Sequence, residues 1–234
     1  MRLAIVPALN EEKSIAAVIQ KLKRHVDQVV VIDDNSTDAT GRIAKKYGAT
    51  VIRHLENRGV GAAMKIGVAY AKKLEPDITI MIDADGQHTP DDIPRLIKPI
   101  IEGKADFVLG SRFLGKHQVS MPFKKRIGNR ILSLIVGFLV REKLSDTQTG
   151  FRALNKKALL SLNLVSDFTY TQEMILTLCF KGLRCVEVPI QVNSRKYGQS
   201  KVASDVINYA LKSLASICFT YLRLKFGINL TNDC

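Results

Sequence analysis

The stretch "ITIMIDADGQHTPDD" (residues 78–92) begins as an apolar run and ends in a group of acids. Residues 78–82 have the pattern of a buried strand, and Asp83 and Asp85 follow at once. In an extended chain, residues i and i+2 point to the same side, so these two carboxylates are expected to converge. Neighbouring carboxylates repel each other unless a cation or sugar hydroxyls lie between them. The stretch therefore predicts a ligand site at the end of a buried strand.

The acids also indicate which ligand the site would take. Carboxylate oxygens suit Mg²⁺ or Mn²⁺, which retain water and bind the phosphates of a substrate. Gln87 lies two residues beyond Asp85 and is placed to complete the same face. A polar turn that caps the next helix is the simpler interpretation, but Thr89 can supply that cap. Asp83, Asp85 and Gln87 are then left for a metal.

Short apolar runs alternate with helical segments along the chain. Strands are predicted at 3–6, 29–32, 51–52, 78–82 and 107–109, and helices at 12–25, 39–47, 61–74 and 91–102. This alternation predicts βαβ units, and hence an α/β fold with a mostly parallel central sheet flanked by helices. Ligands bind beyond the carboxyl ends of the strands in such sheets. Polar sequences follow four of the strands there: "PALNEE" (7–12), "DDNSTD" (33–38), "DADGQH" (83–88) and "GSR" (110–112).

The loop after the third strand, "NRGVGAA" (57–63), contains two glycines but is not a dinucleotide fingerprint. The third glycine is missing, and the loop follows the third strand instead of the first. The chain has no GxxxxGK[ST] segment either, which excludes a P-loop. We expect Gly61 to let a helix begin close to the phosphates or the sugar of a ligand. Asn10, after the first strand, is predicted to cap the helix that follows.

The chain of 234 residues carries a net charge of +13, which points to polyanionic partners. Between residues 112 and 157, eleven Lys and Arg residues stand against two acids. A solvated basic surface would spread these charges more evenly. Nucleic acid, an anionic membrane and phosphorylated substrates all fit the charge. Nucleic acid is the least favoured, because the chain has no Trp, 6% aromatic residues and no recognisable binding module.

Cysteine usage and hydropathy bear on the compartment. The four cysteines form no CxxC pair, so reduced thiols and a cytosolic location are expected. The amino-terminal stretch lacks the apolar core of a signal peptide. No uncharged apolar run reaches the roughly 18 residues that a membrane-spanning helix needs. We therefore expect a protein that does not span a membrane but can lie on one.

Two segments are predicted to be amphipathic helices. In 126–141, basic and small polar residues occupy one face, while isoleucine, leucine and phenylalanine fill the other. Such a helix either anchors at a membrane interface or packs on the sheet. Near the C-terminus, a polar stripe ends at Lys212 and 213–222 is apolar all round. We favour insertion at an interface or burial in a partner. The chain is accordingly divided into 1–204, a catalytic domain, and 205–234, a C-terminal helix.

Seven motifs in order carry a family resemblance. "PALNEE", "VVVIDDNSTDAT" (29–40), "NRGVGAAMKIG" (57–67), "IDADGQHTPDDI" (82–93) and "VLGSRF" (108–113) resemble the inverting family 2 glycosyltransferases of the GT-A fold. "DTQTGFRALNKKAL" (146–159) and "VEVPIQVNSRKYGQSK" (186–201) are similar to the polyprenol-phosphate branch, which includes the dolichyl-phosphate mannose synthases. The similarity covers roughly residues 2 to 202. It implies transfer of one hexose from a nucleotide-sugar to a polyprenyl (dolichyl) phosphate, with inversion and a divalent metal.

The resemblance assigns the donor side of the site. It favours GDP-mannose, with UDP-glucose or a UDP-N-acetylhexosamine as alternatives. The donor would lie across the ends of the first strands. Donor-binding residues by this resemblance are Pro7, Asn10, Glu11, Asp33, Asp34, Ser36, Gly61 and Asp83, and the metal ligands are Asp83, Asp85 and Gln87.

The resemblance also assigns an acceptor side. A polyprenyl phosphate is already ionised, so it needs no general base, but bringing two anionic substrates together requires positive charge. The implied phosphate contacts are Arg112, Lys125 or Arg126, Asn129 (where relatives have Ser), Arg195 and Lys201. Asp83, Asp85, Arg112 and Arg195 are the residues expected to act in catalysis.

Three other classes of function are compatible with parts of the sequence. A GT-A transferase with a soluble acceptor, a non-catalytic homologue and a basic nucleic-acid-binding α/β protein are the rivals. The favoured interpretation places a peripheral enzyme at the cytoplasmic face of an anionic membrane, with a membrane subunit as a possible partner.

Two further residues are ambiguous. Glu173 is either a surface residue or a partner for an active-site cation, and His88 either caps or packs beside the metal loop.

Overall fold

A computed structural model describes residues 1–115, 121–193 and 206–228 of the chain. Its centre is a seven-stranded sheet in the order β3-β2-β1-β4-β6-β5-β7. The strands are β1 (Arg2–Ala8), β2 (Gln28–Asp33), β3 (Thr50–Arg53), β4 (Ile78–Met81), β5 (Phe107–Ser111), β6 (Arg152–Asn155) and β7 (Cys185–Pro189). All neighbours pair in parallel except β6, which runs antiparallel to both β4 and β5.

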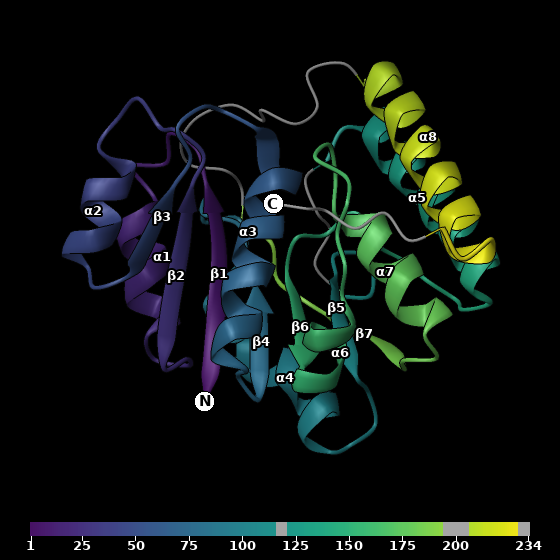
Figure 1. Ribbon diagram of the computed structural model, residues 1–234, viewed down its shortest axis with the longest axis horizontal. Helices are drawn as coiled ribbons and strands as arrows, with labels where there is room; N and C mark the ends of the chain where they lie inside the picture. The colour runs from purple at the N-terminus through teal and green to yellow at the C-terminus, as the bar shows by residue number, and fades with distance from the viewer. Residues whose placement is uncertain (116–120, 194–205, 229–234) are drawn as a thin grey trace.

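Helices cover both faces of the sheet (Figure 1). One face carries α1 (Ile15–Leu22), α2 (Thr40–Lys46) and α4 (Ile93–Ile101). The other carries α3 (Gly59–Leu74), α5 (Phe123–Val140), α6 (Lys156–Ser161), α7 (Thr171–Phe180) and α8 (Val206–Lys225). Central strands are therefore buried on both sides, which explains their continuous apolar sequences. In β1, every residue from Leu3 to Ala8 is buried.

The predicted α/β fold and its parallel strands are confirmed. Each of the five predicted strands and four predicted helices occurs, with small differences at the ends; β4, for example, ends at Met81 instead of Ile82. Strands β6 and β7 and helix α6 were not predicted. Strand β6 is four residues long and begins with the fully buried Arg152, and β7 contains Glu187, so neither has the composition of a core strand.

The two helix caps predicted from the sequence had different outcomes. The Thr89 prediction is confirmed, because its hydroxyl oxygen accepts a hydrogen bond from the Asp91 amide at the start of a short 3₁₀ turn. The Asn10 prediction is wrong: α1 begins after Ser14. Asn10 has a left-handed backbone (φ 51°), which Asn tolerates better than most residues. Its side-chain oxygen accepts instead from the Thr37 amide at 2.8 Å.

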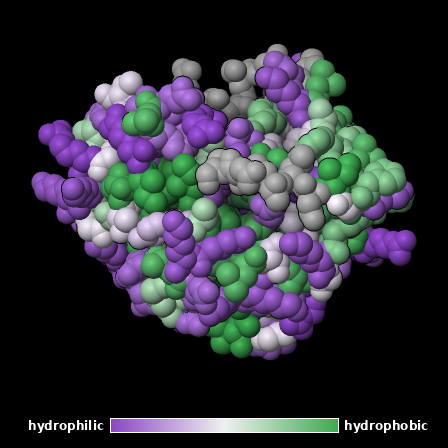
Figure 2. Space-filling model, in the orientation of Figure 1, coloured by the Kyte–Doolittle hydropathy of each residue, from purple (hydrophilic) through white to green (hydrophobic). Residues whose placement is uncertain are grey.

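Helices α5 and α8 pack against each other and carry large apolar residues on their outer sides as well as in the core. The buried side of α5 consists of Asn129, Leu132, Ser133, Val136 and Gly137, and the buried side of α8 includes Ser213, Ile217 and Thr220. Large apolar residues are exposed on both: Phe123, Ile127, Ile131, Leu134 and Phe138 from α5, and Leu211, Phe219 and Leu222 from α8. We call these eight residues the apolar outer face. Figure 2 shows hydrophobic residues gathered where Figure 1 places α8. The apolar side predicted for α5 is therefore largely exposed, although Ile135 on that side packs against the core.

No helix in the described ranges is long and apolar enough to cross a membrane. The proposed division at residue 204 falls within 194–205, outside the described residues. Helix α8 itself contacts both α5 and α7.

Two glycines inside helices offer a matched test of the packing between α3 and the sheet. A Cβ on Gly67 would collide with the side chain of Ile5 in β1, whereas a Cβ on Gly128 in α5 would meet nothing within 4 Å. We expect Gly67→Ala to lower the free energy of unfolding by about 1–3 kcal/mol through overpacking. Gly128→Ala should instead raise it by about 0.5–1 kcal/mol, because Gly is a poor helix former. Urea denaturation of both variants measures these changes, and equal effects would contradict the close packing at Gly67.

Candidate active site

A cavity of about 500 Å³ lies at the carboxyl ends of β1, β2, β4 and β5. This is the edge of the sheet at which the sequence predicts a ligand site. Its lining residues are Pro7, Ala8, Leu9, Glu11, Asp34, Asn57, Gly59, Val60, Ala63, Asp83, Ala84, Asp85, Gln87, Arg112, Lys125, Asn129, Gln148 and Tyr209. Acidic residues come from the loops after β1, β2 and β4, and basic residues come from the end of β5 and from α5. The cavity therefore has an acidic side and a basic side.

Asp83 and Asp85 both line the cavity, as does Gln87. The extended backbone that was expected to align the two acids is absent, because β4 ends at Met81 and a turn follows. The turn is shaped by Gly86, which has a φ of 72°, and by the Gln87 amide, which donates to the Asp85 carboxylate at 2.9 Å. Within the described ranges, no three His, Cys, Asp or Glu residues cluster in a way that could hold a metal.

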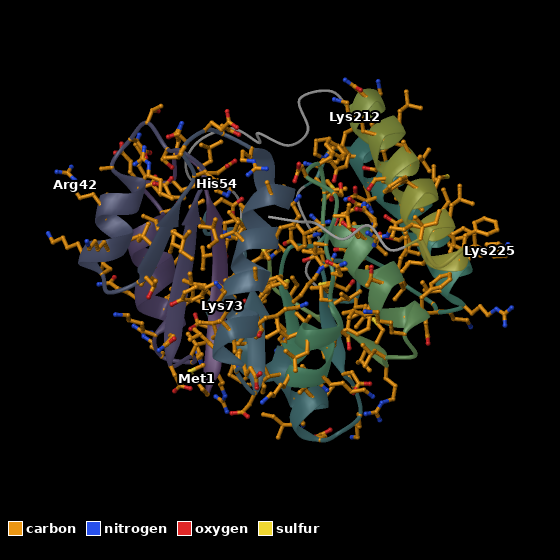
Figure 3. The ribbon with its side chains drawn as sticks, in the orientation of Figure 1. Met1, Arg42, His54, Lys73, Lys212 and Lys225 are labelled. Atoms are coloured by element: carbon orange, nitrogen blue, oxygen red, sulfur yellow. The ribbon has the colours of Figure 1, made fainter. Side chains whose placement is uncertain are left out.

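The Asp34 carboxylate organises part of the acidic side of the cavity. It accepts hydrogen bonds from the backbone amides of Arg58 at 2.9 Å and Gly59 at 2.8 Å, and it lies 2.6 Å from Nδ1 of His54. Figure 3 places His54 near the same edge of the sheet. These bonds fix the start of α3, whose first turn lines the cavity through Gly59, Val60 and Ala63. A helix N-terminus is a favourable place for phosphate groups.

The structure brings only some of the predicted donor residues into the lining. Pro7, Glu11 and Asp34 line the cavity, whereas Asn10, Asp33 and Ser36 do not. These three support the neighbouring turn. Asp33 is fully buried and accepts from the Ser36 amide at 2.9 Å, and the Ser36 hydroxyl accepts from the Asn10 amide at 2.9 Å.

Gly61 has a different role from the one expected. It was predicted to allow close approach to a ligand, but it does not line the cavity. A Cβ at Gly61 would collide with the backbone of Ser166 and Asp167, in the loop between α6 and α7. The glycine is needed because that loop lies directly on the first turn of α3.

Arg112 stands on the basic side, held by a buried carboxylate. Its Nε and Nη2 donate to Asp146 at 2.7 and 2.9 Å, and its own amide donates to Asp146 at 3.1 Å. Burial works against the charge on Arg112, but the Asp146 carboxylate outweighs it and raises the pKa of the guanidinium. Asp146 is itself fixed, because its amide donates to Glu187 of β7 at 2.9 Å. The result is a permanent, oriented positive charge on the cavity wall.

Helix α5 supplies the other basic contact. Lys125 lines the cavity, whereas Arg126 is exposed and does not, so the geometry favours Lys125 of the two alternatives. Asn129 also lines the cavity and is buried. The remaining acceptor predictions, Arg195 and Lys201, lie outside the described residues.

Sequence reasoning missed several residues that build the basic side. Most of them lie in "DTQTGFRA" (146–153), within one of the motifs that carry the family resemblance. Asp146 holds Arg112, Gln148 lines the cavity, and Gly150 lies so close to Asp83 that a Cβ would be 2.5 Å from its Oδ2. The buried Arg152 donates to the carbonyls of Thr147, Thr149 and Thr171, which shapes the loop. Tyr209, from α8, also lines the cavity, and no sequence pattern singled it out.

The two ambiguous residues are both buried. His88 is 7% exposed and stacks on Phe151 at 5.6 Å, which confirms the packing interpretation. Burial, with Arg112 nearby, lowers the pKa of His88 to about 4, so it packs as a neutral ring. Glu173 is 1% exposed, which excludes the surface interpretation.

Comparison with known proteins decides the family. A model described as Glycosyl transferase family 2 matches residues 3–162. The chain belongs to this family. This glycosyltransferase is 35% identical to the UDP-N-acetylglucosamine–dolichyl-phosphate N-acetylglucosaminyltransferase of Methanococcus voltae, over 95% of each chain. It is 29% identical to the undecaprenyl-phosphate mannosyltransferase of Micrococcus luteus, over 89% of this chain and 90% of that one.

The fold of the glycosyltransferase also matches solved structures. Glucosyl-3-phosphoglycerate synthase from Mycobacterium tuberculosis, crystallised with Mn²⁺, UDP-glucose and phosphoglyceric acid, superposes with a TM-score of 0.74. The sequence identity is 21%, and the match covers 99% of this chain and 81% of that one. The GT-A fold implied by the sequence motifs is confirmed.

The contact between Gly150 and Asp83 yields a test of the acidic side. We expect Gly150→Ala to push the Asp83 carboxylate out of position and to reduce turnover by about 100-fold, because small displacements of reacting groups are costly. Circular dichroism and a thermal melt serve as controls that the variant is folded. A folded variant with normal turnover would show that the position of Asp83 does not matter.

Proposed function

We propose that this glycosyltransferase moves one sugar from a nucleotide-sugar to a polyprenyl phosphate, with inversion at the sugar. The observation that carries the proposal is the composition of the basic side. Its described lining residues are Arg112, Lys125, Asn129, Gln148 and Tyr209, and none of them is a carboxylate. A hydroxyl acceptor needs a general base at this position, whereas a phosphate monoester is already ionised. A phosphate oxygen can attack the sugar directly once positive charge holds it in place.

The opposite charges of the two sides support a separate place for each substrate in the cavity. The nucleotide-sugar would lie on the acidic side, with its diphosphate near the first turn of α3 and the turn after β4. The acceptor phosphate would lie between Arg112 and Lys125. Arg112 is rigid, because Asp146 holds it, so it can orient the phosphate as well as attract it. Lys125 adds a second positive charge from α5.

A divalent metal fits the acidic side. Asp83 and Asp85 supply two carboxylates, and Gln87 supplies an amide oxygen. Mg²⁺ and Mn²⁺ are bound in this way by one or two carboxylates, with substrate phosphates and water as the other ligands. When bound, the metal would neutralise the diphosphate that leaves. Mg²⁺ and Mn²⁺ are both compatible with these residues.

Two donors are supported by different observations. The sequence motifs favour GDP-mannose, and the Micrococcus luteus relative is named a mannosyltransferase. UDP-N-acetylglucosamine is the second candidate, because the 35% identical Methanococcus voltae relative is named for that donor.

We propose further that the apolar outer face lies on the cytoplasmic surface of an anionic membrane. A helix pair that exposes large apolar residues from both of its helices suits an apolar environment. Exposed Lys124, Arg126 and Arg130 on α5 suit anionic headgroups. Lys125, which follows Lys124, lines the cavity. A membrane in contact with α5 would therefore lie beside the basic side of the cavity. A membrane subunit is the alternative occupant of this face.

Transfer activity tests the proposed reaction. The purified protein is incubated with each radiolabelled donor, a polyprenyl phosphate and Mg²⁺ or Mn²⁺, and the lipid product is extracted. We expect transfer with one donor, loss of transfer with chelator, and a loss of about 100-fold or more in Asp85→Ala, because leaving-group charge is no longer stabilised. Equal transfer to the non-phosphorylated polyprenol would contradict the phosphate acceptor, and full activity in Asp85→Ala would contradict the metal site.

Flotation with vesicles tests the membrane surface. We expect the protein to float with phosphatidylglycerol vesicles at low salt and less at high salt, where charge is screened. The double variant Ile131→Glu/Phe138→Glu should not float. Ile101→Glu is the matched control, because Ile101 is exposed at the end of α4, on the opposite face of the sheet. Flotation of the double variant would mean that another surface binds the membrane.

A further inference from the structure

A single buried carboxylate joins three segments behind the cavity. Glu173, on α7, accepts from the amides of Val165 at 2.8 Å and Ser166 at 2.9 Å, in the loop between α6 and α7. Nη2 of Arg223, near the end of α8, lies 3.2 Å from the same carboxylate. Arg223 is 6% exposed and Glu173 is 1% exposed. The pair therefore ties α8 to α7 and to the loop from inside the protein.

Net stability does not explain a pair of this kind. Removing two charges from water is costly, and well-packed apolar residues often hold helices together equally well. Burial raises the pKa of Glu173 despite the two amide bonds and the nearby Arg223, so the carboxylate pays a real desolvation cost. What an ion pair with fixed partners adds is a defined position. The ion pair fixes both the rotation of α8 about its axis and its position along that axis relative to α7.

The other end of α8 reaches the cavity. Tyr209 lines the cavity, and its hydroxyl donates to Oε1 of Gln148 at 3.0 Å. Its ring lies 5.5 Å from the ring of Phe168, which also lies under the ammonium of Lys212 at 5.8 Å. Figure 3 labels Lys212 near this end of α8 and Lys225 near the other. A rise of 1.5 Å per residue separates Tyr209 from Arg223 by about 21 Å.

We propose that Glu173 and Arg223 are positioning residues for the acceptor: they fix the far end of α8, and the fixed helix holds Tyr209 in the cavity wall. The inference rests on the proposed function, which places the acceptor phosphate on this side. Tyr209 then forms the wall next to Gln148, against which the phosphate lies as Arg112 and Lys125 hold it. A helix that tilts or rotates would withdraw this wall and leave the phosphate poorly oriented.

The donor side has its own attachment to the same loop. Lys65 of α3 donates to the Val165 carbonyl at 3.2 Å and forms an ion pair with Asp167. Glu173 holds the loop through two amides without help from Arg223. Loss of Arg223 alone should therefore leave the loop and the start of α3 in place. This predicts a defect that is confined to the acceptor.

Steady-state kinetics with varied donor and varied acceptor test the proposal. We expect Arg223→Met to raise the KM for polyprenyl phosphate by about 10- to 100-fold, with the donor KM unchanged, because the acceptor is misplaced. Arg223→Lys should restore most of the loss, since it keeps the charge. Arg184→Met is the matched control: Arg184 pairs with Asp106 at 3.2 Å at the amino ends of β5 and β7, away from the cavity, and its removal should change neither KM.

A double-variant cycle separates positioning from a general loss of stability. Tyr209→Ala should raise the acceptor KM by a similar factor, and adding Arg223→Met to it should cost little more, because both changes act on one contact. Glu173→Gln/Arg223→Met should recover part of the melting temperature while the acceptor KM stays high, because Gln leaves no unpaired charge and its side-chain oxygen can still accept from the loop amides. Independent, multiplying effects of Tyr209→Ala and Arg223→Met would overturn the proposal. Recovery of acceptor KM together with the melting temperature would do so as well.

Hydrogen exchange gives a readout that does not need the acceptor. We expect amides of residues 209–213 to exchange faster in Arg223→Met than in the wild type, and those of 59–63 to be unchanged. If the wild type transfers no sugar to polyprenyl phosphate, the proposed function is wrong, and exchange still tests the link along α8. Unchanged exchange at 209–213 would show that Arg223 does not control the cavity end of the helix.

Discussion

The ion pair between Arg112 and Asp146 is the contact on which the site depends. It joins the end of β5 to the loop that precedes β6, and Asp146 is in turn held by Glu187 of β7. The same loop continues to Gly150, which lies against Asp83 on the acidic side. One short segment thus sets the distance between the positive and the negative half of the cavity. Because Asp146 pairs with Arg112, the guanidinium can be buried and keep its charge without a bound ligand.

Much of the first half of the fold could be predicted from the sequence. Strands β1, β2 and β4 are buried on both faces, so their apolar runs are unmistakable, and polar residues at their ends marked the cavity. The pattern of apolar residues was less informative for strands that contain a buried charge. Arg152 begins a core strand, yet as a charged residue it is typical of a surface, so β6 escaped prediction. Its charge is satisfied by three backbone carbonyls that are distant from any recognisable pattern.

The candidate site was predictable to a similar degree. Asp83, Asp85, Asp34 and Arg112 stand at strand ends, where topology alone brings them together. Roles that depend on tertiary contact were not accessible. Gly61 resembled a ligand-binding glycine, but it makes room for the loop at Asp167. Tyr209 comes from a helix distant in sequence, and its place in the wall depends on how α8 packs. The apolar faces of α5 and α8 were predictable, whereas the side on which each helix packs was not.

The position of β6 has a consequence for how the chain is made. Strands β3, β2, β1 and β4 are complete within the first 81 residues and form one continuous part of the sheet. β5 has no partner in that part, because its neighbours are β6 and β7, which come later in the chain. During synthesis, the edge of β4 stays unpaired until residues 152–155, which form β6, have been made. The half of the sheet that carries the acidic side of the cavity can thus assemble first, and the half that carries Arg112 is added to it later.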